Sequence, residues 1–452
     1  MGKTRAGAHA ALTHTASIVG NYDVYRAAFR AAGIIEAESL QELLDYCLTF
    51  SMLKQRPGRR LLISTNAGGA GAVAADEAEL DGLEVRPLDG ATANRVKRSF
   101  GGIPRSSVPP LGNPMDLTAT VNTDFFVKAT GEALAAPYYD MAVVLPTHQT
   151  PTVSPEIAQQ MADRLLRSGK PASVCVMGKS ELASMIHSEF LARGIPSFPT
   201  PERAVKSMAA LSMYSMLCRS SRPVRSLTVR VSRGTASTSE GYMPWMTIES
   251  LMDRYGIHLP RSVILASGII GKGVERLKFP LACKLLSREL AHKTDVGGVI
   301  LGVENKRELN SAVRRLIGLA RSLAVRFDGI LVQEMVKDGI ELLLGATRDE
   351  VFGPTLTLGA GGKYAELIRE YAVAIAPLDI GGARALASRT VVGKELGGYR
   401  GGPHKASELA SLVSRFSRIL LDHPRIHQIE INPLMVSDAG LSAVDVRVVV
   451  AG

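Results

Sequence analysis

A histidine lies near the start of the chain in the stretch LTHTASIVG, residues 12–20. His14 is surrounded there by small and hydroxyl-bearing side chains. A neutral imidazole is a good nucleophile, and a phosphoryl group carried on its nitrogen is easily passed on. Most histidines, however, are solvated or make a single hydrogen bond within a fold. The rest of the sequence must therefore decide whether His14 has a chemical role.

A second candidate is the loop STNAGGAGAVAADE, residues 64–77, which lies between an apolar run and a helical pattern. Gly68 and Gly69 would let backbone N–H groups approach an anion, and the N-terminus of the following helix adds positive potential. Asn66 belongs to the same loop. The Gly-Lys-Ser/Thr of a Walker A motif does not follow. A plain tight turn explains the glycines about as well.

The stretch CKLLSRELAHKTDVGGV, residues 283–299, contains a lysine and a histidine that could act on a phosphate. Lys284 lies in a strand-like run, from which it could reach a nucleotide phosphate. His292 and Lys293 follow, shortly before a Gly-Gly turn. A polar β-turn with a solvated lysine is the alternative interpretation.

Two segments near the end of the chain, IEINPL (429–434) and SAVDVRV (442–448), read as neighbouring strands. They carry Glu430, Asn432 and Asp445. A carboxylate and an amide that face one point are the hard oxygen ligands that suit Mg²⁺ with a nucleotide. Cross-strand pairing of polar side chains on a solvated face is the alternative.

The first part of the chain alternates strand and helix patterns. Residues 22–50 contain two helical patterns separated at Gly33. The following strands and helices are expected at 61–64, 72–80, 141–146, 155–168, 172–177 and 180–193. Such alternation predicts a parallel, doubly wound sheet over about 57–215.

The pattern changes after residue 218. Residues 219–240 contain five arginines, many hydroxyl residues and one acid, which predicts a solvated interdomain linker; a nucleic-acid-binding arm is the alternative. From 241 onward, strand-like runs dominate, with helices expected at 245–257, about 305–325 and 405–421. This composition predicts an α+β domain built around an antiparallel sheet.

Composition narrows the functional classes. The chain has 452 residues, a net charge of +10 and only 5% aromatic residues, so its surface attracts anions but offers no platform for stacking nucleobases of RNA. We expect no nucleic acid as partner. The four cysteines form no CxxC pair, and we expect neither a signal peptide nor a membrane-spanning segment, because the first residues lack an apolar core and no apolar run is long enough to span a bilayer. A cytoplasmic protein without a membrane partner is expected.

These motifs, in this order, resemble the ADP-forming acyl-CoA synthetases, relatives of succinyl-CoA synthetase. The resemblance covers nearly the whole chain and rests on LTHTASIVGNYD, LLISTNAGGAGA, GNPMDL, HKTDVGGV, GGYRGGP and IEINPL. It implies an α/β fold: flavodoxin-like doubly wound ligase domains followed by an ATP-grasp α+β domain. The implied boundaries are 1–54 for the C-terminal part of the phosphohistidine domain, 55–218 for the flavodoxin-fold domain, 219–240 for the linker and 241–452 for ATP-grasp.

The resemblance also implies site residues. Lys284 would contact the phosphates of ATP or ADP, and Glu334 and Glu341 would line the nucleotide pocket. Asn432 and Asp445 would hold Mg²⁺.

Two histidines would carry the phosphoryl group. The resemblance implies that His14 is the phosphohistidine and that His292 is a second station between His14 and the nucleotide. The loop with Asn66, Gly68 and Gly69 would neutralise the phosphoryl charge. The implied activity is that of an ADP-forming acid–thiol ligase: acyl-CoA + ADP + phosphate = carboxylic acid + CoA + ATP.

The chain departs from the family pattern in two places. Ala16 stands where the family commonly has glycine after its phosphohistidine. No CoA-binding domain precedes the first motif, so we expect another subunit to supply it. A catalytically incomplete, nucleotide-binding remnant or regulatory subunit is the alternative, as is a truncated reading frame. A protein acyltransferase is disfavoured because 452 residues leave no room for an added acetyltransferase domain.

Overall fold

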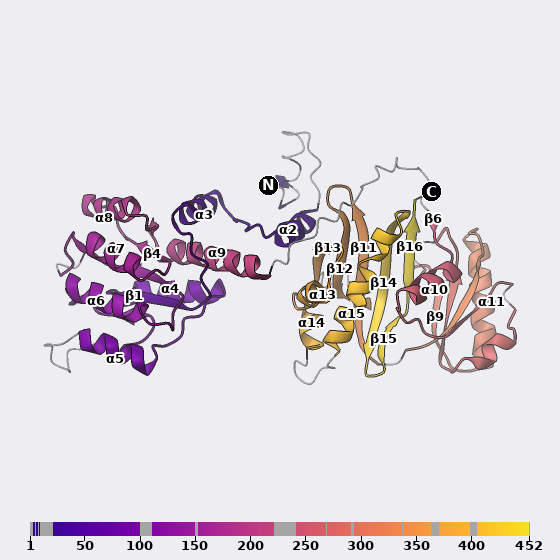
Figure 1. Cartoon of the computed structure of the whole chain (residues 1–452). Coiled ribbons are helices and arrows are strands. Elements are labelled where there is room, and N and C mark those ends of the chain that lie inside the picture. The colour runs from indigo at the N-terminus through magenta and orange to yellow at the C-terminus, as the bar shows by residue number, and fades with distance from the viewer. Residues whose placement is uncertain are drawn as a thin grey trace. The chain divides into compact units, whose positions relative to one another are not determined.

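The computed structural model describes residues 3, 4, 6, 7, 9, 21–99, 111–149, 152–220, 241–267, 269–290, 293–336, 338–362, 370–397 and 405–451. The chain forms two compact units (Figure 1). One comprises residues 32–227, and the other comprises residues 1–31 together with 228–452. The residues expected as a first domain, 1–54, are thus divided between the units, and the predicted domain boundaries remain a prediction.

Residues 32–227 form a five-stranded sheet in the order β2-β1-β3-β4-β5, with every pair parallel. This confirms the predicted doubly wound sheet. Its elements are α3 (Leu40–Met52), β1 (Leu61–Thr65), α4 (Gly68–Leu80), α5 (Gly90–Ser99), β2 (Met115–Asp116), α6 (Thr123–Leu134), β3 (Met141–Leu145), α7 (Ile157–Arg167), β4 (Ala172–Cys175), α8 (Glu181–Ala192), β5 (Ser197–Phe198) and α9 (Pro201–Ser220).

The central strands β1, β3 and β4 are buried along their whole length because helices cover both faces of the sheet. Alternate side chains separate into two cores. Leu62 and Val144 pack with α5, α6, α7 and α8, whereas Ile63 and Val143 pack with α3, α4 and α9. The strand order reverses between β1 and β3, so the loops after these two strands meet at the carboxyl edge, where ligands of such folds bind.

The second unit contains α2 and two antiparallel sheets. Its elements are α2 (Tyr22–Ala31), β6 (Gly241–Tyr242), α10 (Trp245–Arg254), β7 (Ser262–Leu265), the 3₁₀ helix η2 (Lys272–Arg276), β8 (Leu281–Leu286), β9 (Val299–Val303), α11 (Lys306–Ser322), β10 (Gly329–Glu334), β11 (Ile340–Asp349), β12 (Gly353–Ala360), β13 (Tyr371–Ile375), α13 (Ile380–Ala387), α14 (Val391–Glu395), α15 (Ala406–Phe416), α16 (Ile419–Asp422), β14 (Ile426–Ser437), β15 (Gly440–Ala443) and β16 (Val446–Val450).

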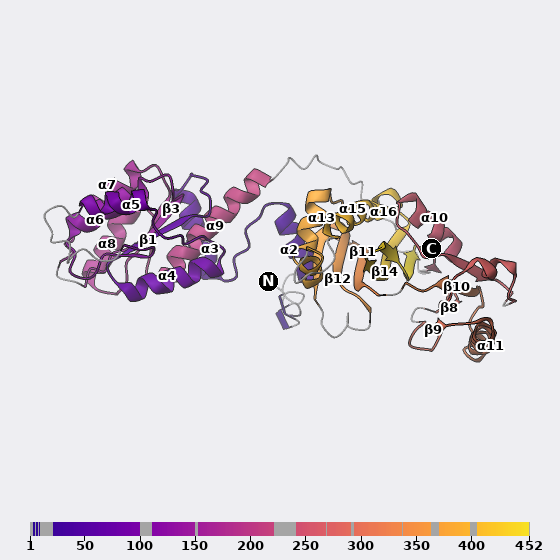
Figure 2. The same cartoon turned by 90° about the horizontal axis from the view of Figure 1, so that it is seen from below.

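The smaller sheet has the order β7-β10-β8-β9 and packs one face against α11. The larger, seven-stranded sheet runs β13-β12-β11-β14-β16-β6, with β15 paired to β14. Figure 2 shows α13, α15 and α16 along one face of the larger sheet. The predicted antiparallel sheet is present as two separate sheets, because β10 pairs with β7 and β8 instead of with β11, which follows it in the chain.

Two local features refine the helix predictions. The helix expected at 405–421 is divided after Phe416, where the Ser417 hydroxyl donates to the Ser414 carbonyl at 2.7 Å and accepts the Leu378 N–H at 3.0 Å. Near the chain start, α2 packs on the edge strand β13 through Val24, Ala27 and Val373. The segment that follows the His14 motif is therefore joined to the larger sheet.

Candidate nucleotide and phosphoryl-transfer site

Lys284 lies in the seam between the two sheets of the second unit. It stands on β8, where apolar neighbours on both sides make the strand fully buried, and only 3% of the residue is exposed. Its Nζ donates to Gln333 Oε1 at 2.9 Å and to the Val444 carbonyl oxygen at 2.8 Å. Burial lowers the pKa of this ammonium, while nearby Asp445 raises it. The predicted phosphate ligand is thus a desolvated cation that bridges the sheets.

Asn432 and Asp445 meet on the larger sheet, beside Lys284. The Asn432 N–H donates to the Asp445 carbonyl oxygen at 3.0 Å, and the Val444 N–H donates to the Pro433 carbonyl oxygen at 3.0 Å. Lys293 Nζ lies 4.0 Å from Asp445 Oδ1. The structure therefore brings the two predicted metal ligands together, with a cationic side chain next to the carboxylate.

A glycine turn follows β12 and closes over Asn432. The Gly362 N–H donates to Asn432 Oδ1 at 2.9 Å, and the Gly361 N–H donates to the Glu341 carbonyl oxygen at 2.8 Å. Gly362 has a φ of +64°, and a Cβ there would lie 1.4 Å from Glu341 Oε2. Glycine is favoured at this position, since the left-handed backbone conformation strains other residues and a Cβ would displace the Glu341 carboxylate. Glu341 is thereby placed against the turn that holds Asn432.

Glu334 is the last residue of β10, and its carboxylate is hydrogen-bonded to the backbone of the same unit. Its carboxylate accepts the Lys278 N–H at 2.8 Å, and its own N–H donates to the Arg261 carbonyl oxygen at 2.9 Å. The side chain therefore fixes the end of the strand.

Sequence reasoning missed two groups of the seam, namely the Gln333 amide and the Val444 carbonyl. Gln333 lies one residue before Glu334 and is completely buried. A glutamine in an otherwise apolar strand, GILVQE, was the available signal. No residue type in the sequence identifies the Val444 carbonyl, because the direction of this backbone group depends on the connection between β15 and β16.

The predicted phosphate loop lies at the carboxyl edge of the parallel sheet. Asn66 is buried, and its side chain accepts the Thr147 N–H at 2.7 Å and donates to the Thr147 carbonyl at 3.2 Å, which ties the loops after β1 and β3 together. Gly68 and Gly69 form the first turn of α4, whose N-cap, Ala67, provides no side-chain hydrogen bond. The backbone N–H groups of this turn are thus left for an anion.

Asp116 limits what the first turn of α4 can bind. A Cβ added to Gly68 would lie 2.8 Å from Asp116 Oδ2, so a carboxylate already borders the helix N-terminus. The glycine leaves room for this carboxylate. An anion that binds the turn must share its positive end with Asp116.

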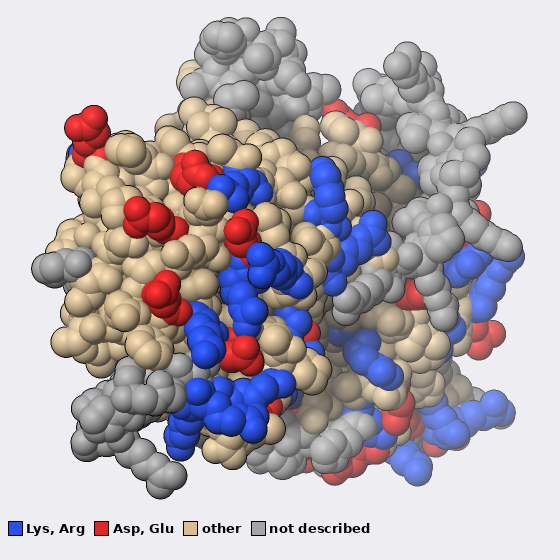
Figure 3. Space-filling model, turned by 60° about the vertical axis from the view of Figure 1, so that its left-hand side comes forward, with Lys and Arg blue, Asp and Glu red and all other residues tan. Residues whose placement is uncertain are grey.

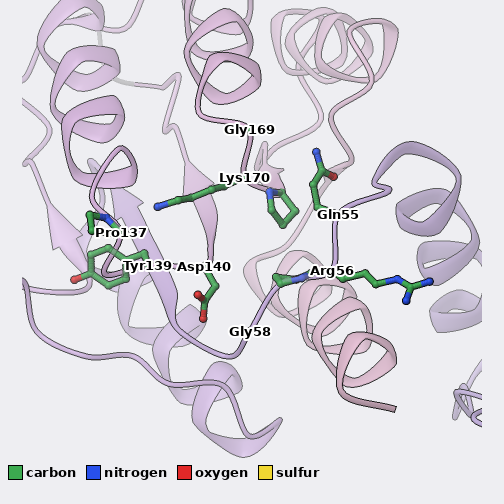
Figure 4. Close-up of a pocket in the computed structure, with 10 residues that line it drawn as sticks. Gln55, Arg56, Gly58, Pro137, Tyr139, Asp140, Gly169 and Lys170 are labelled. Atoms are coloured by element: carbon green, nitrogen blue, oxygen red, sulfur yellow. The ribbon is translucent and has the colours of Figure 1, made fainter. Parts of the chain in front are cut away.

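A separate hollow of about 300 Å³ opens at the opposite, amino edge of the same sheet (Figure 4). Asp140 and Lys170 line it, but both are bonded within the fold. The Asp140 carboxylate accepts hydrogen bonds from the Arg60 side chain and backbone, and Lys170 Nζ donates to the Leu134 and Ala136 carbonyls. These hydrogen bonds tie the segments before β1, β3 and β4 to one another and to the end of α6, so both charged side chains are used within the fold.

The two predicted phosphohistidines, His14 and His292, lie outside the described residues, as does the linker from 221 to 240. Within the part of the chain that is described, no three His, Cys, Asp or Glu side chains are grouped to hold a metal ion. No helix among those residues has the length and apolarity to cross a membrane. On the face drawn in Figure 3, lysine and arginine side chains gather with acidic ones between them.

Comparisons with known proteins identify two domain families in the chain. The sequence pattern of the ATP-grasp domain matches residues 236–450, and that of the succinyl-CoA ligase like flavodoxin domain matches residues 1–50. The ADP-forming acetate–CoA ligase I of Archaeoglobus fulgidus is 33% identical over 99% of this chain. The chain spans 65% of that relative's length.

Two further comparisons cover about half of the chain. The two subunits of the ADP-forming acetate–CoA ligase I of Pyrococcus furiosus match this chain separately. The alpha subunit is 34% identical over 47% of this chain and 45% of its own length. The beta subunit is 28% identical over 44% of this chain and 88% of its own length. A solved acetyl-coenzyme A synthetase 1 of Candidatus Korarchaeum cryptofilum, in complex with coenzyme A and Mg-AMPPCP, is 28% identical over 46% of this chain and 92% of its own, with a TM-score of 0.40.

Proposed function

Since the chain belongs to the family of ADP-forming acyl-CoA synthetases, we propose that it carries the phosphoryl-transfer part of such an enzyme. The overall reaction is acyl-CoA + ADP + phosphate = carboxylic acid + CoA + ATP. The observation that carries the proposal is Lys284, a buried cation held between two sheets next to Asn432 and Asp445. Burying an ammonium is costly unless it serves an anion, and the phosphates of ATP or ADP are that anion.

The residues around Lys284 suit a magnesium–nucleotide. Asp445 supplies a carboxylate and Asn432 an amide oxygen, which are the hard donors that Mg²⁺ takes, with phosphate oxygens and water as its remaining ligands. The Lys293 ammonium, 4.0 Å from Asp445 Oδ1, shows that this carboxylate accommodates a positive charge. Bound Mg²⁺ would neutralise phosphate charge during transfer. Glu334 and Glu341 would border the rest of the nucleotide.

The proposed phosphoryl path uses the two histidines. At the thioester site, phosphate attacks the acyl carbon, CoA leaves as thiolate, and an acyl phosphate forms. A nitrogen of His14 then attacks the phosphorus and the carboxylate leaves. The phosphoryl group passes to His292, and finally an oxygen of the ADP β-phosphate attacks it and releases neutral imidazole. The loop of Asn66, Gly68 and Gly69 would stabilise the phosphoryl charge on the way through its N–H groups.

The CoA part of the site is proposed to come from a partner. The relative from Pyrococcus furiosus is divided into alpha and beta subunits, so a family member can be assembled from separate chains. We propose that a subunit with the CoA-binding domain completes this enzyme. We also propose a cytoplasmic location, which the free state of Cys47, Cys175, Cys218 and Cys283 supports.

Labelling with ATP tests the proposal. The whole chain, incubated with γ-labelled ATP and Mg²⁺, should gain an acid-labile, base-stable phosphoryl group. His14→Ala should abolish stable labelling. His292→Ala should slow transfer to His14 while ATP affinity is kept, because an imidazole station contributes to transfer more than to binding. A matched control is His258→Ala, since His258 has no predicted role in phosphoryl transfer.

The alternative, a nucleotide-binding remnant, gives a different result. Such a protein would bind ATP with Mg²⁺ yet remain unlabelled, also after addition of a subunit with a CoA-binding domain. Absence of ATP binding by the folded chain would refute both functions.

A further inference from the structure

Helix α3 has apolar side chains on two sides, and the unit that contains it covers one of them. Leu48 and Met52 pack against the core that α3 shares with α4 and α9. On this inner side the Asp45 carboxylate is also buried, and it accepts hydrogen bonds at 2.6 and 2.7 Å from the Arg203 side chain of α9. The inner side of α3 is therefore fixed on its own unit by apolar packing and by an ion pair.

The other side of α3 carries a stripe of exposed leucines. Leu40, Leu43 and Leu44 are 73%, 48% and 56% exposed, and the exposed Cys47 continues this leucine stripe. Residues three, four and seven positions apart lie on one face of a helix. A single exposed leucine is ordinary, whereas several apolar side chains on one face mark a surface that another protein covers. A helix that is apolar on two sides suits a position between two layers.

Carboxylates border the leucine stripe. Glu42 is part of the same helix, and Lys206 Nζ lies 3.4 Å from both Glu42 Oε1 and Glu77 Oε1, which joins α3 to α4 through α9. Burial and the charges of Glu42 and Asp81 raise the pKa of the Tyr46 hydroxyl to about 12, so Asp81 belongs to the same group. Three carboxylates and one ammonium leave this border negative. A second copy of the chain would bring the same negative charge, whereas a partner with lysine or arginine would complement it.

The domain family of this segment indicates what packs on the stripe. Residues 1–50, which include most of α3, match the succinyl-CoA ligase like flavodoxin domain. Domains of this fold place helices on the faces of a parallel sheet. The described residues of the segment contain helices and loops but no strand. The leucine stripe is thus the side that a covering helix turns toward a sheet, and the described part of the segment does not supply that sheet.

We propose that the leucine stripe of α3 packs on the parallel sheet of a flavodoxin-like domain in the CoA-binding partner subunit, with basic side chains of that subunit opposite Glu42 and Glu77. This inference rests on the proposed function, because it requires that partner. The alpha subunit of the Pyrococcus furiosus ligase matches this chain over only 45% of its own length, so a family member has room for such a domain. Helix α3 would then join two sheets, one in each subunit.

Alkylation of Cys47 tests this contact on the unmodified full chain. The probe is the part of the Archaeoglobus fulgidus ligase I that lies outside its match to this chain, purified in a folded, CoA-binding form. Iodoacetamide labelling of Cys47, measured by peptide mass spectrometry, should slow by roughly tenfold when the probe is added, since a covered thiol is shielded from the reagent. Cys175 is buried, so its labelling reports unfolding and serves as the control. Unchanged labelling of Cys47 at every probe concentration would overturn the inference.

Two variants locate the contact. Leu44→Asp and Leu166→Asp are a matched pair, because both leucines are 56% exposed and only Leu44 belongs to the stripe. Leu44→Asp should weaken binding of the probe by about tenfold or more in calorimetry, since it puts a charge where an apolar side chain is to be buried. Leu166→Asp should leave this affinity unchanged, and neither variant should shift the urea midpoint of the chain. Equal loss of affinity in both variants, or in neither, would show that the stripe is not the contact.

Two further results separate this inference from its alternatives. A dimer of the chain alone in sedimentation equilibrium, abolished by Leu44→Asp, would assign the stripe to a second copy and overturn the inference. Labelling by ATP is measured in the same samples. A chain that ATP labels while Cys47 stays unprotected would show that the proposed function holds and the contact is wrong. A protected Cys47 in a chain that binds no ATP would show that the contact exists and the proposed function fails.

Discussion

Replacing Lys284 by methionine should separate its role in binding from its role in stability. The ammonium is expected to make a charge-assisted hydrogen bond to a phosphate, because two of its three N–H donors are already used by Gln333 and Val444. Hydrogen bonds to charged groups contribute about 1.5–3 kcal/mol. Each 1.4 kcal/mol is a factor of ten in affinity. Lys284→Met should therefore weaken ATP binding by roughly 10- to 100-fold.

The free energy of unfolding should change much less. The substitution leaves two buried acceptors unpaired, at a cost of about 1–3 kcal/mol each. It also removes a buried charge, whose desolvation costs several kcal/mol. These effects oppose each other, so a net change within about 2 kcal/mol is expected. Urea unfolding of the whole chain measures it, and Lys306→Met is the matched control because the Lys306 side chain is 77% exposed.

The pH dependence gives this prediction a second readout. Burial lowers the pKa of Lys284, so between that pKa and the ordinary lysine value of about 10.4 the unfolded chain binds more protons than the folded chain. The free energy of unfolding should then rise with pH in this window, while ATP affinity should fall as the ammonium is lost. Both slopes should be smaller in Lys284→Met. Unchanged ATP affinity in that variant would refute the assignment of Lys284 to the phosphates.

Three further predictions concern the neighbouring groups. Asp445→Asn should reduce ATP affinity about tenfold in excess Mg²⁺ and leave it nearly unchanged in chelator, as calorimetry would show, because a charged oxygen ligand is lost. Gly362→Ala should lower stability by about 1–2 kcal/mol in thermal unfolding and weaken ATP binding, since its Cβ would displace Glu341. Asp45→Asn should cost about 2–3 kcal/mol in urea unfolding, because it breaks the paired bonds at 2.6 and 2.7 Å from Arg203 that hold α3 to α9.

Most of the parallel sheet could be predicted because each central strand is a short run of neighbouring residues with a recognisable composition. The run at Leu61–Thr65 and its counterparts at 141–145 and 172–175 are mainly apolar and fully buried, as expected of strands covered on both faces. The edge strands β2 and β5 contain two residues each and leave no readable pattern. The fold class is confirmed, whereas the division of the second unit into two antiparallel sheets could not be predicted, since strand pairing depends on contacts far apart in the chain.

The candidate site was predictable only as far as side-chain types allow. Lys284, Asn432 and Asp445 could be named because they are polar residues within strand patterns of a recognisable family. Their meeting point depends on backbone bonds such as that from Asn432 N–H to the Asp445 carbonyl, which no side chain reveals. That Gln333 Nε2 is unpaired within the described structure could not be predicted for the same reason, because whether this donor has an acceptor depends on the groups that the fold places around it.

The seam between the two sheets indicates how nucleotide binding and packing are linked. Lys284 reaches across it to the Val444 carbonyl at 2.8 Å, so the two sheets are already joined by a polar bond before any nucleotide contributes. A ligand that enters must use the third ammonium donor and the Gln333 amide, or exchange for the Val444 bond. Replacing the Lys284–Val444 hydrogen bond by one to the ligand gains little free energy, whereas giving an acceptor to a buried, unpaired donor gains more. Affinity should therefore depend on the acceptors that the ligand presents to groups left unpaired by the fold, and Gln333 is the clearest of these.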